Sequence, residues 1–195
     1  MKHVNTYFEH IATIADMIDK QKIESFTNAL RTTRDISNGR VFVLGVGGSA
    51  GNASHMVNDL RKLCSIETYA PTDNVSELTA RTNDEGFDTV FVEYLRTSRL
   101  NSNDAIIVLS VGGGDADRQV SVGLIKAIDY AHKMEACVLS IVGKPDGYAA
   151  KNSDLAIVVP SIDPKWITPI SEAYQAVVWH CVVSHPDLQM RNTKW

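Results

Sequence analysis

Two pairs of residues in this sequence combine metal-binding or proton-transferring side chains with helical spacing. His55 and Asp59 are four residues apart in a segment with helical periodicity, so they share one helix face. Glu172 and His180 are eight residues apart, about 80° around a helix axis, with the small Ala176 between them. Two imidazoles and two carboxylates on two helices could enclose a divalent ion such as Zn²⁺. Taken alone, the first pair is also consistent with a surface hydrogen bond, and Glu172 with a favourable position in a helix dipole.

A glycine-rich turn follows the first apolar run of the chain. The run 40–44 ends in the sequence GVGGS at 45–49, where a strand is expected to pass into a helix. Glycines at such a turn let backbone amides approach an anion, and the helix N-terminus adds its positive dipole. The turn lacks the third glycine of a dinucleotide fingerprint and the Gly-Lys-Ser/Thr of a Walker loop. The alternative interpretation is a tight turn in which Ser49 caps the helix.

A second turn of the same kind strengthens the anion-binding interpretation. Three glycines lie between Ser110 and Asp115, after the next apolar run, and Arg118 and Ser121 come shortly afterwards. Two such turns at one edge of a parallel sheet can converge on a phosphate. Ser110 and Ser121 would supply hydroxyls, and Arg118 a charge-assisted hydrogen bond. Arg118 and Asp115 are also compatible with solvated loop charges.

Alternating apolar runs and helical periodicities define the fold class. Buried strands are expected at 40–45, 105–110, 136–142 and 155–159, and helices at 49–63, 86–99, 120–133 and 169–184. Strands that alternate with helices indicate an α/β fold with a doubly wound, mainly parallel five-stranded sheet. Ligands of such sheets bind beyond the carboxyl ends of the strands, where both glycine turns lie.

The first 38 residues are expected to form a helical arm ahead of this core. Apolar residues recur at helical spacing from Val4 to Leu30, which predicts two helices broken near 21–22 and ended by a glycine cap at 38–39. Their apolar stripe faces either the chain's own core or another subunit. We interpret residues 1–195 as a single domain with the arm, 1–38, at an oligomer interface.

Composition narrows the classes of partner. The 195 residues include 19 Lys and Arg against 23 Asp and Glu, a net charge of −4, which argues against a nucleic-acid partner. No segment approaches the roughly 20 apolar residues that span a bilayer, and the polar N-terminus is not typical of a signal peptide. Three scattered cysteines without a CxxC pattern indicate reduced thiols and a cytoplasmic protein. The tryptophans are predicted to be packing or interface groups: Trp166, Trp179 and Trp195.

The combined motifs resemble one family. Residues 45–55, with the sequence GVGGSAGNASH, resemble the GNGGSAADAQH stretch of the phosphoheptose isomerases, which have the sugar-isomerase (SIS) fold. Residues 83–91 are similar to the family's NDYGY…VF segment. The likeness continues through Ser110, through 121–127 and through the helix that carries Glu172 and His180. The resemblance therefore covers nearly the whole chain.

The resemblance implies an activity, a metal and a set of site residues. Members of the family convert sedoheptulose 7-phosphate to a D-glycero-D-manno-heptose 7-phosphate, as homotetramers with active sites at subunit interfaces. Their zinc ligands (His, Glu, Gln and His) correspond to His55, Asp59, Glu172 and His180. The substrate-binding set, to which we add Arg118 and Glu172, comprises Val46, Gly47, Gly48, Ser49, Asn83, Asp84, Ser110 and Ser121.

The sequence also departs from the family pattern. Val46 replaces an asparagine, and the loop between Ser110 and Ser121 is longer and poorer in hydroxyls than the family's. Phosphate binding would therefore rely more on backbone amides and on Arg118. Asp59 replaces a glutamate and Glu172 a glutamine, which makes the expected metal site more anionic.

The leading hypothesis is an aldose–ketose isomerase that works through an ene-diol. Asp59 would be the general base and His180 the acid–base partner, while a metal ion polarises the carbonyl. The alternative is a non-catalytic SIS protein, a sugar-phosphate sensor or a partner-binding tetramer, which the hydroxyl-poor loop would fit. Retention of His55 and His180 argues against it. A nucleotide-binding flavodoxin-like protein is disfavoured, because no acidic ribose-binding residue follows the first turn at the expected distance.

Overall fold

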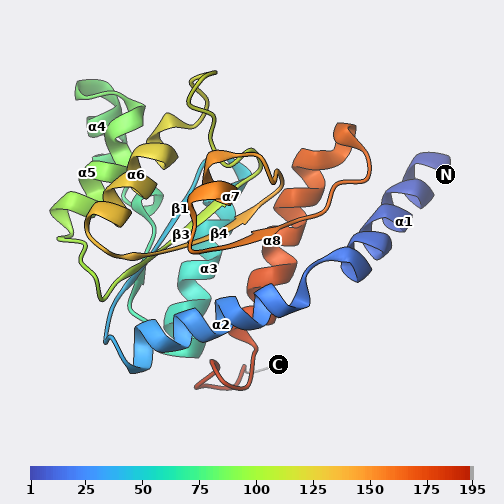
Figure 1. The fold of residues 1–195 in the computed structure, drawn as a ribbon, viewed down its shortest axis with the longest axis horizontal. Helices are drawn as coiled ribbons and strands as arrows, with labels where there is room; N and C mark the ends of the chain where they lie inside the picture. The colour runs from blue at the N-terminus through green and yellow to red at the C-terminus, as the bar shows by residue number, and fades with distance from the viewer. Residues whose placement is uncertain (194–195) are drawn as a thin grey trace.

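A five-stranded sheet lies at the centre of the molecule. The computed structural model describes residues 1–193, so the packing role predicted for Trp195 lies outside the described residues. The strand order is β2-β1-β3-β4-β5, and every pair is parallel (Figure 1). The predicted α/β fold with a doubly wound sheet is confirmed. The strands are β1 (Val41–Gly45), β2 (Thr68–Tyr69), β3 (Ala105–Ser110), β4 (Cys137–Val142) and β5 (Leu155–Val158).

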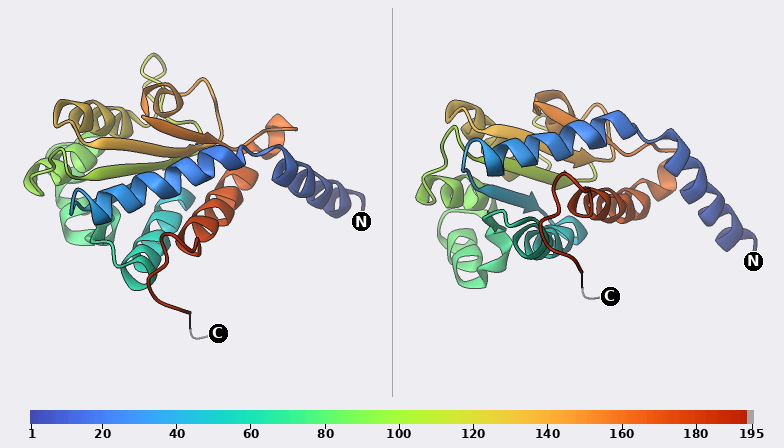
Figure 2. Two further views of the ribbon diagram at one scale, coloured as in Figure 1. Left: turned by 60° about the horizontal axis from the view of Figure 1, so that its bottom comes forward. Right: turned by 90° about the horizontal axis from the view of Figure 1, so that it is seen from below.

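Helices cover both faces of the sheet, and each face has its own apolar cluster. One cluster joins α2, α3 and α8 to the sheet, and the other joins α5, α6 and α7 to the opposite face (Figure 2). The helices are α1 (Lys2–Met17), α2 (Lys20–Asp35), α3 (Gly48–Cys64), α4 (Val75–Asp84), α5 (Val90–Thr97), α6 (Val122–Lys133), α7 (Tyr148–Asn152) and α8 (Ile167–Val183). Short 3-10 turns lie at Pro71–Asp73, Phe87–Thr89 and Pro164–Trp166.

Two of these helices, α3 and α8, lie side by side and run in the same direction. Asn52 Nδ2 donates to the Glu172 carbonyl at 2.9 Å near their first turns, and Cys64 Sγ donates to the Val183 carbonyl at 3.5 Å near their last. Each helix follows a parallel strand, so both begin at the carboxyl edge of the sheet. Residues at matching heights on α3 and α8 therefore face one another.

The N-terminal arm consists of two helices, as expected, but the break comes earlier than predicted. Asp19 caps α2 by accepting a hydrogen bond from the Lys22 amide at 3.1 Å, so the chain turns at Ile18–Asp19. The first helix, α1, extends away from the body of the molecule (Figure 1). Its Val4 and Phe8 side chains are 53% and 64% exposed.

The arm ends near the predicted position, but not through the glycine cap that the sequence suggested. The residue with left-handed backbone is Asn38 (φ 49°), not the glycine that follows it. Gly39 is required by a close approach instead, because a β-carbon there would lie 1.8 Å from the Asn103 carbonyl oxygen. Glycine at this position therefore allows the arm to pass tightly over the loop before β3.

Four short elements were missed or misplaced by the sequence patterns. The helix expected at 86–99 is a 3-10 turn followed by α5, and α4 precedes it. Since α4 has no buried residue, it shows no apolar stripe that periodicity could detect. The two-residue strand β2 and the five-residue α7 are too short for any periodicity. Among the described residues, no helix is both long enough and apolar enough to cross a membrane.

Candidate active site

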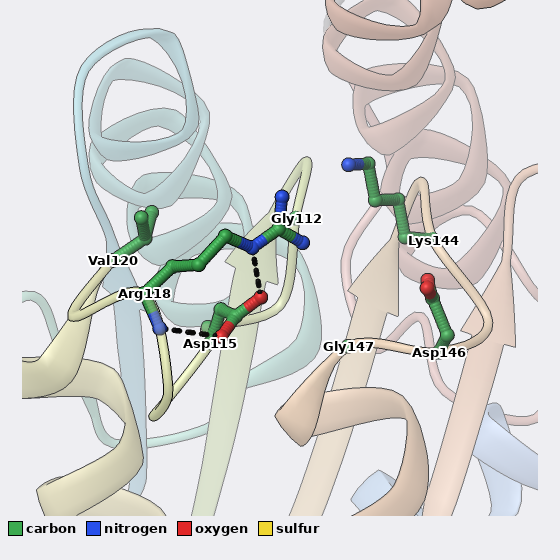
Figure 3. A pocket seen from close by; sticks show the side chains of 8 residues that line it. Gly112, Asp115, Arg118, Val120, Lys144, Asp146 and Gly147 are labelled. Atoms are coloured by element: carbon green, nitrogen blue, oxygen red, sulfur yellow. Dashed lines mark hydrogen bonds and ion pairs between the residues drawn. The ribbon is translucent and has the colours of Figure 1, made fainter.

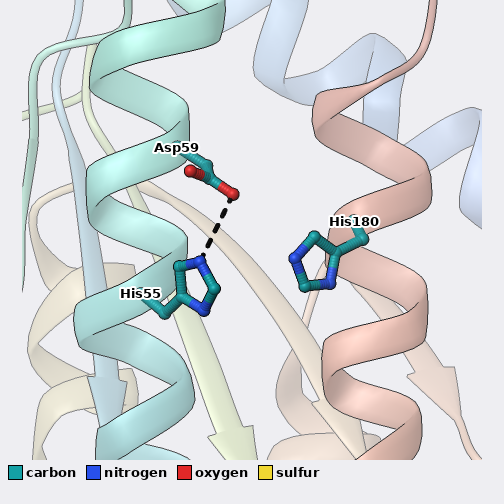
Figure 4. Close-up of side chains that lie close together, drawn as sticks. All are labelled: His55, Asp59 and His180. Atoms are coloured by element: carbon teal, nitrogen blue, oxygen red, sulfur yellow. Dashed lines mark ion pairs between the residues drawn. The ribbon is translucent and has the colours of Figure 1, made fainter. Parts of the chain in front are cut away.

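Three side chains from α3 and α8 converge on one point. His55 and Asp59 lie one turn apart on α3, and His180 faces them from α8 (Figure 4). Ligand atoms of the three residues all lie within 4.8 Å of one another. His55 Nε2 lies 3.7 Å from Asp59 Oδ2, and the two imidazole rings meet edge to face with their centroids 5.4 Å apart. The helical spacing of four thus places a carboxylate and an imidazole together, as predicted for this pair.

Hydrogen bonds fix the orientation of two of these groups. The Nδ1 atom of His180 lies 2.8 Å from the Ala176 carbonyl oxygen. A carbonyl only accepts, so Nδ1 carries the proton and Nε2 keeps its lone pair. Asn58 Nδ2 donates to Asp59 Oδ1 at 2.8 Å, which leaves Oδ2 as the oxygen nearer His55. A second nitrogen tied to a carbonyl is the usual arrangement of a metal-binding histidine.

Trp179 packs against both imidazoles. Its ring centroid lies 4.6 Å from that of His55 and 3.6 Å from that of His180, and its side chain is fully buried. The predicted packing role of this tryptophan agrees with its position between the apolar core and the site. The rigid indole limits the rotamers open to its two neighbours, which favours one fixed geometry of the group.

The three residues line a cavity of about 390 Å³. The side chain of Asp59 is only 13% exposed, whereas that of His55 is 57% exposed, so one wall is protected and the mouth is open. The remaining lining comes from the last turns of the two helices and from the C-terminal segment: Asn58, Lys62, Leu63, Val183, Ser184, Gln189 and Thr193.

Glu172 does not join this group. Among the described residues, the convergent set contains His55, Asp59 and His180 only, so the four-ligand arrangement is not observed. Eight residues separate Glu172 from His180, a rise of about 12 Å along the helix. At that height α8 faces the start of α3, and a β-carbon on Gly48 would lie 2.5 Å from Glu172 Oε2.

The first glycine turn is tight and leads directly into α3. Gly47 is the N-cap residue with φ 63°, and no side chain caps the helix, so the capping role considered for Ser49 is not observed. The side chain of Ser49 is buried, while Val46 is 41% exposed. A β-carbon at Gly45 would lie 2.4 Å from the Ser49 carbonyl oxygen, which is why glycine is needed there.

The second turn folds into a small closed loop. Asp115 and Val120 exchange two backbone hydrogen bonds of 2.9 Å, and Ser110 Oγ accepts a hydrogen bond from the Gly113 amide at 3.0 Å. The Asp115 carboxylate accepts from the Arg118 amide and from its Nε atom, and these bonds hold the pKa of Asp115 below its usual value. Ser121 lies at the N-cap of α6 with φ 52°.

A second cavity, of about 230 Å³, lies between this loop and the loop after β4. Arg118 and Lys144 reach over it from opposite loops (Figure 3). Asp115 binds the Nε atom of Arg118, so the terminal nitrogens of the guanidinium remain directed to the cavity. Two carboxylates, Asp115 and Asp146, line the same cavity, so the guanidinium end of Arg118 and the Lys144 ammonium are the groups there that suit an anion.

Asn83 and Asp84 lie apart from both cavities within one chain. They end α4, where Asn83 Nδ2 donates to Asp84 Oδ1 at 2.8 Å, and both are exposed. Neither residue lines the two cavities described above.

The sequence patterns missed two kinds of site residue. Asn58, which orients Asp59, lies beside it in the sequence, and a polar residue flanking a candidate base is a signal that could have been used. Gln189 follows the last helix and has no periodic pattern or motif that would mark it.

Fold and site together define an open doubly wound α/β protein with a candidate metal and acid–base group between two helices. The SIS domain family matches residues 6–143, and the chain belongs to that family.

Comparison with individual proteins gives more specific similarities. The lincomycin biosynthesis protein LmbN of Streptomyces lincolnensis is 32% identical over 156 residues, which are 76% of this chain and 56% of that protein. This chain therefore matches little more than half of that relative's length. A phosphoheptose isomerase of Helicobacter pylori is 28% identical over 152 residues, 75% of this chain and 76% of the enzyme.

A solved structure confirms the fold. The phosphoheptose isomerase GmhA of Neisseria gonorrhoeae superimposes with a TM-score of 0.80 at 23% identity, covering 93% of this chain and 96% of that one. Together with the sequence relatives, this confirms the resemblance that the glycine turn and its helix indicate.

Proposed function

We propose that this protein is a sugar-phosphate aldose–ketose isomerase that converts sedoheptulose 7-phosphate to D-glycero-D-manno-heptose 7-phosphate. The convergence of His55, Asp59 and His180 within 4.8 Å carries the proposal. A carboxylate and an imidazole with a bare nitrogen are the two groups that such a proton transfer needs. The similarity to several phosphoheptose isomerases supports the choice of substrate.

The chain's own residues supply the proton transfers. Asp59 takes the proton from the carbon next to the carbonyl and returns it to the neighbouring carbon after the ene-diol has formed. His180, through Nε2, moves a proton between the two substrate oxygens. Asn58 holds Oδ1 of Asp59, so Oδ2 is the basic atom. Trp179 keeps both imidazoles in place.

The same three residues fit a divalent cation such as Zn²⁺. Two imidazoles and one carboxylate form a common ligand set for catalytic zinc, and the hydrogen bond from His180 Nδ1 frees its Nε2 atom for coordination. When bound, such an ion polarises a carbonyl and stabilises a developing oxyanion. A carboxylate that coordinates a cation is a weaker base, so the roles of base and ligand compete for Asp59. The same holds for His180, because the single lone pair of Nε2 can either accept a proton or bind the cation.

The phosphate of the substrate is assigned to the second glycine turn. The carboxylate of Glu172 already places a negative charge at the start of α3, which disfavours a second anion there. At the second turn Arg118 and Lys144 offer two positive charges beside Asp115 and Asp146, and the terminal nitrogens of Arg118 remain directed to the cavity. In this proposal Ser110 and Ser121 shape that turn, and the sugar chain runs along the first turn, past Val46, Gly47, Gly48, Ser49 and Glu172.

The two halves of the site suggest that copies of the chain cooperate. Gly48 precedes His55 by seven positions on α3, a rise of about 10 Å, so the first glycine turn lies well above the acid–base group. We propose a homotetramer in which a neighbouring copy completes each site and brings Asn83 and Asp84 to it. The exposed apolar side chains of α1 support the arm as an interface. The three free cysteines favour a cytoplasmic location.

One assay tests the proposed function. The purified chain, supplied with Zn²⁺, is incubated with sedoheptulose 7-phosphate, and formation of the aldose is followed by chromatography. The proposal requires the aldose to appear. Tight binding of the sugar phosphate without turnover would instead identify a non-catalytic sensor, the function that the exposed Val46 and the hydroxyl-poor loop would fit.

A further inference from the structure

The last ten described residues form a strap across the ends of α2 and α3. We call residues 184–193 the C-terminal strap. Leu188 is fully buried, and Arg34 Nη1 donates to its carbonyl oxygen at 2.6 Å. The amides of Met190 and Arg191 both donate to the Leu63 carbonyl oxygen, at 2.8 and 3.0 Å. The backbone of the strap is therefore held against two helices (Figure 2).

The strap forms one wall of the cavity that holds the acid–base group. Ser184, Gln189 and Thr193 line the same cavity as His55, Asp59 and His180. Ser184 is engaged with its own helix, since its hydroxyl donates to the His180 carbonyl oxygen at 2.8 Å. Gln189 is half-buried, and its backbone amide donates to the His185 carbonyl oxygen at 2.8 Å. These bonds hold the backbone from which its side chain reaches the cavity.

We infer that Gln189 is a specificity-determining residue that binds the hydroxyl group at the reacting end of the substrate, on the side of the acid–base group away from the glycine turns. The inference rests on the proposed function. A primary amide offers two donor hydrogens and a carbonyl acceptor, which matches neighbouring hydroxyls that both donate and accept. The strap lies outside residues 6–143, the part of the chain that the SIS domain family matches.

The choice of Gln189 follows from how firmly it is held. A residue can discriminate between ligands only if its support does not move to accommodate the wrong one. Leu188 on one side is buried and Met190 on the other is bonded through its backbone, so the Gln189 side chain has a fixed base. A ligand without hydroxyls would leave this amide unpaired, which is the physical basis of rejection.

The test compares two non-reactive probes on four proteins. Glucitol 6-phosphate carries a hydroxyl on each of its other carbons, whereas hexyl phosphate has the same chain length and none. The proteins are the wild type, Gln189→Ala, Gln189→Met and Met190→Ala. The last is the matched control, because Met190 lies on the same strap but is 62% exposed and does not line the cavity. Dissociation constants are measured by calorimetry in the presence of Zn²⁺.

Both Gln189 variants are expected to bind glucitol 6-phosphate about 3–10-fold more weakly than the wild type, the loss of a net hydrogen bond or two. Hexyl phosphate should bind all four proteins equally, and Met190→Ala should match the wild type. With sedoheptulose 7-phosphate, the Gln189 variants should show a raised KM and an unchanged kcat. If Gln189→Ala has a lower thermal midpoint than the wild type, the affinities of the wild type are compared with those of Gln189→Met, which keeps the side-chain length.

Equal affinities of the wild type and Gln189→Met for glucitol 6-phosphate would overturn the inference. So would a wild type that prefers hexyl phosphate. Failure of the proposed function would give a different result. The wild type would then isomerise no sedoheptulose 7-phosphate, but its affinity for glucitol 6-phosphate could still be compared with that of the Gln189 variants.

Discussion

The carboxylate of Glu172 lies against the α-carbon of Gly48, so close that a methyl group added at residue 48 would come within 2.5 Å of Glu172 Oε2. Gly48 is the first residue of α3, where the helix dipole favours a negative charge. The first glycine turn therefore holds an anion that belongs to the chain itself. Gly48 makes room for a side chain from α8, and in the proposed function the second turn remains for the phosphate of the substrate.

This relationship predicts different costs for two glycine substitutions. At Gly48 the added methyl meets the end of a flexible side chain, so Gly48→Ala should lower the free energy of unfolding by less than about 1 kcal/mol. At Gly45 it meets the Ser49 backbone at 2.4 Å, and Gly45→Ala should cost about 1–3 kcal/mol through overpacking. Urea denaturation of the two variants beside the wild type measures both values. Equal costs would contradict the contrast.

Asp59→Asn should lower kcat by about 10²–10⁴-fold, because the amide cannot accept the proton from carbon. The substitution preserves shape, so the thermal midpoint should change little. His132→Ala is the control, since His132 is exposed on α6 and lies outside the cavity. Isomerase assays of the three proteins with sedoheptulose 7-phosphate give the comparison. Full turnover by Asp59→Asn would remove this residue from the chemistry.

Removal of either imidazole should weaken Zn²⁺ binding. Loss of a supporting hydrogen-bond partner costs about 10–100-fold in metal affinity, so His55→Ala and His180→Ala, which remove ligands, should cost at least that much. Competition with a chromogenic chelator measures the affinity without reference to activity. His185→Ala serves as the control, because that imidazole pairs with Glu24, 3.2 Å away, outside the group. If His185→Ala lost as much Zn²⁺ affinity as His55→Ala and His180→Ala, the result would argue against a specific site.

The buried thiol of Cys64 and the half-buried thiol of Cys137 predict a loss of stability at alkaline pH. Burial raises the pKa of Cys64 and Cys137 from 9.0 to about 11. The unfolded chain therefore ionises these thiols at a lower pH than the folded one. Their contribution to stability is complete below pH 9.0 and is lost as the pH rises to about 11.

Thermal midpoints between pH 8 and 11 test this prediction. The double variant Cys64→Ala/Cys137→Ala should show a flatter decline than the wild type. Cys181→Ala, which removes an exposed thiol, should follow the wild type closely. Parallel curves for the wild type and the double variant would show that other groups cause the decline.

The fold could be predicted from the sequence because its main strands are continuous apolar runs. Val41–Gly45 and Ala105–Ser110 are buried on both faces of the sheet. A strand buried in this way consists almost entirely of apolar residues, and such a run can be recognised in the sequence. Thr68–Tyr69 and α4 escaped prediction for the opposite reason. The strand is too short to show a pattern, and the helix buries nothing.

The candidate site could be predicted only in part, because helical spacing describes one helix at a time. The four-residue spacing of His55 and Asp59 is a local property, and the structure brings these residues together. Whether His180 or Glu172 would join them depends on how α8 lies along α3, which no local pattern contains. The angle between Glu172 and His180 suggested a common face, but their separation along the axis places them at different heights.

The order of the elements along the chain has a consequence for biosynthesis. Translation proceeds from the N-terminus, so the sheet and α3 emerge before α8 and the strap. A nascent polypeptide displays one imidazole and one carboxylate with nothing opposite them. In the proposed function, the group that binds a cation and moves protons is therefore complete only after α8 has been translated. A polypeptide that stops before α8 keeps His55 and Asp59 but lacks both His180 and the side chains that α8 adds to the apolar cluster on that face of the sheet.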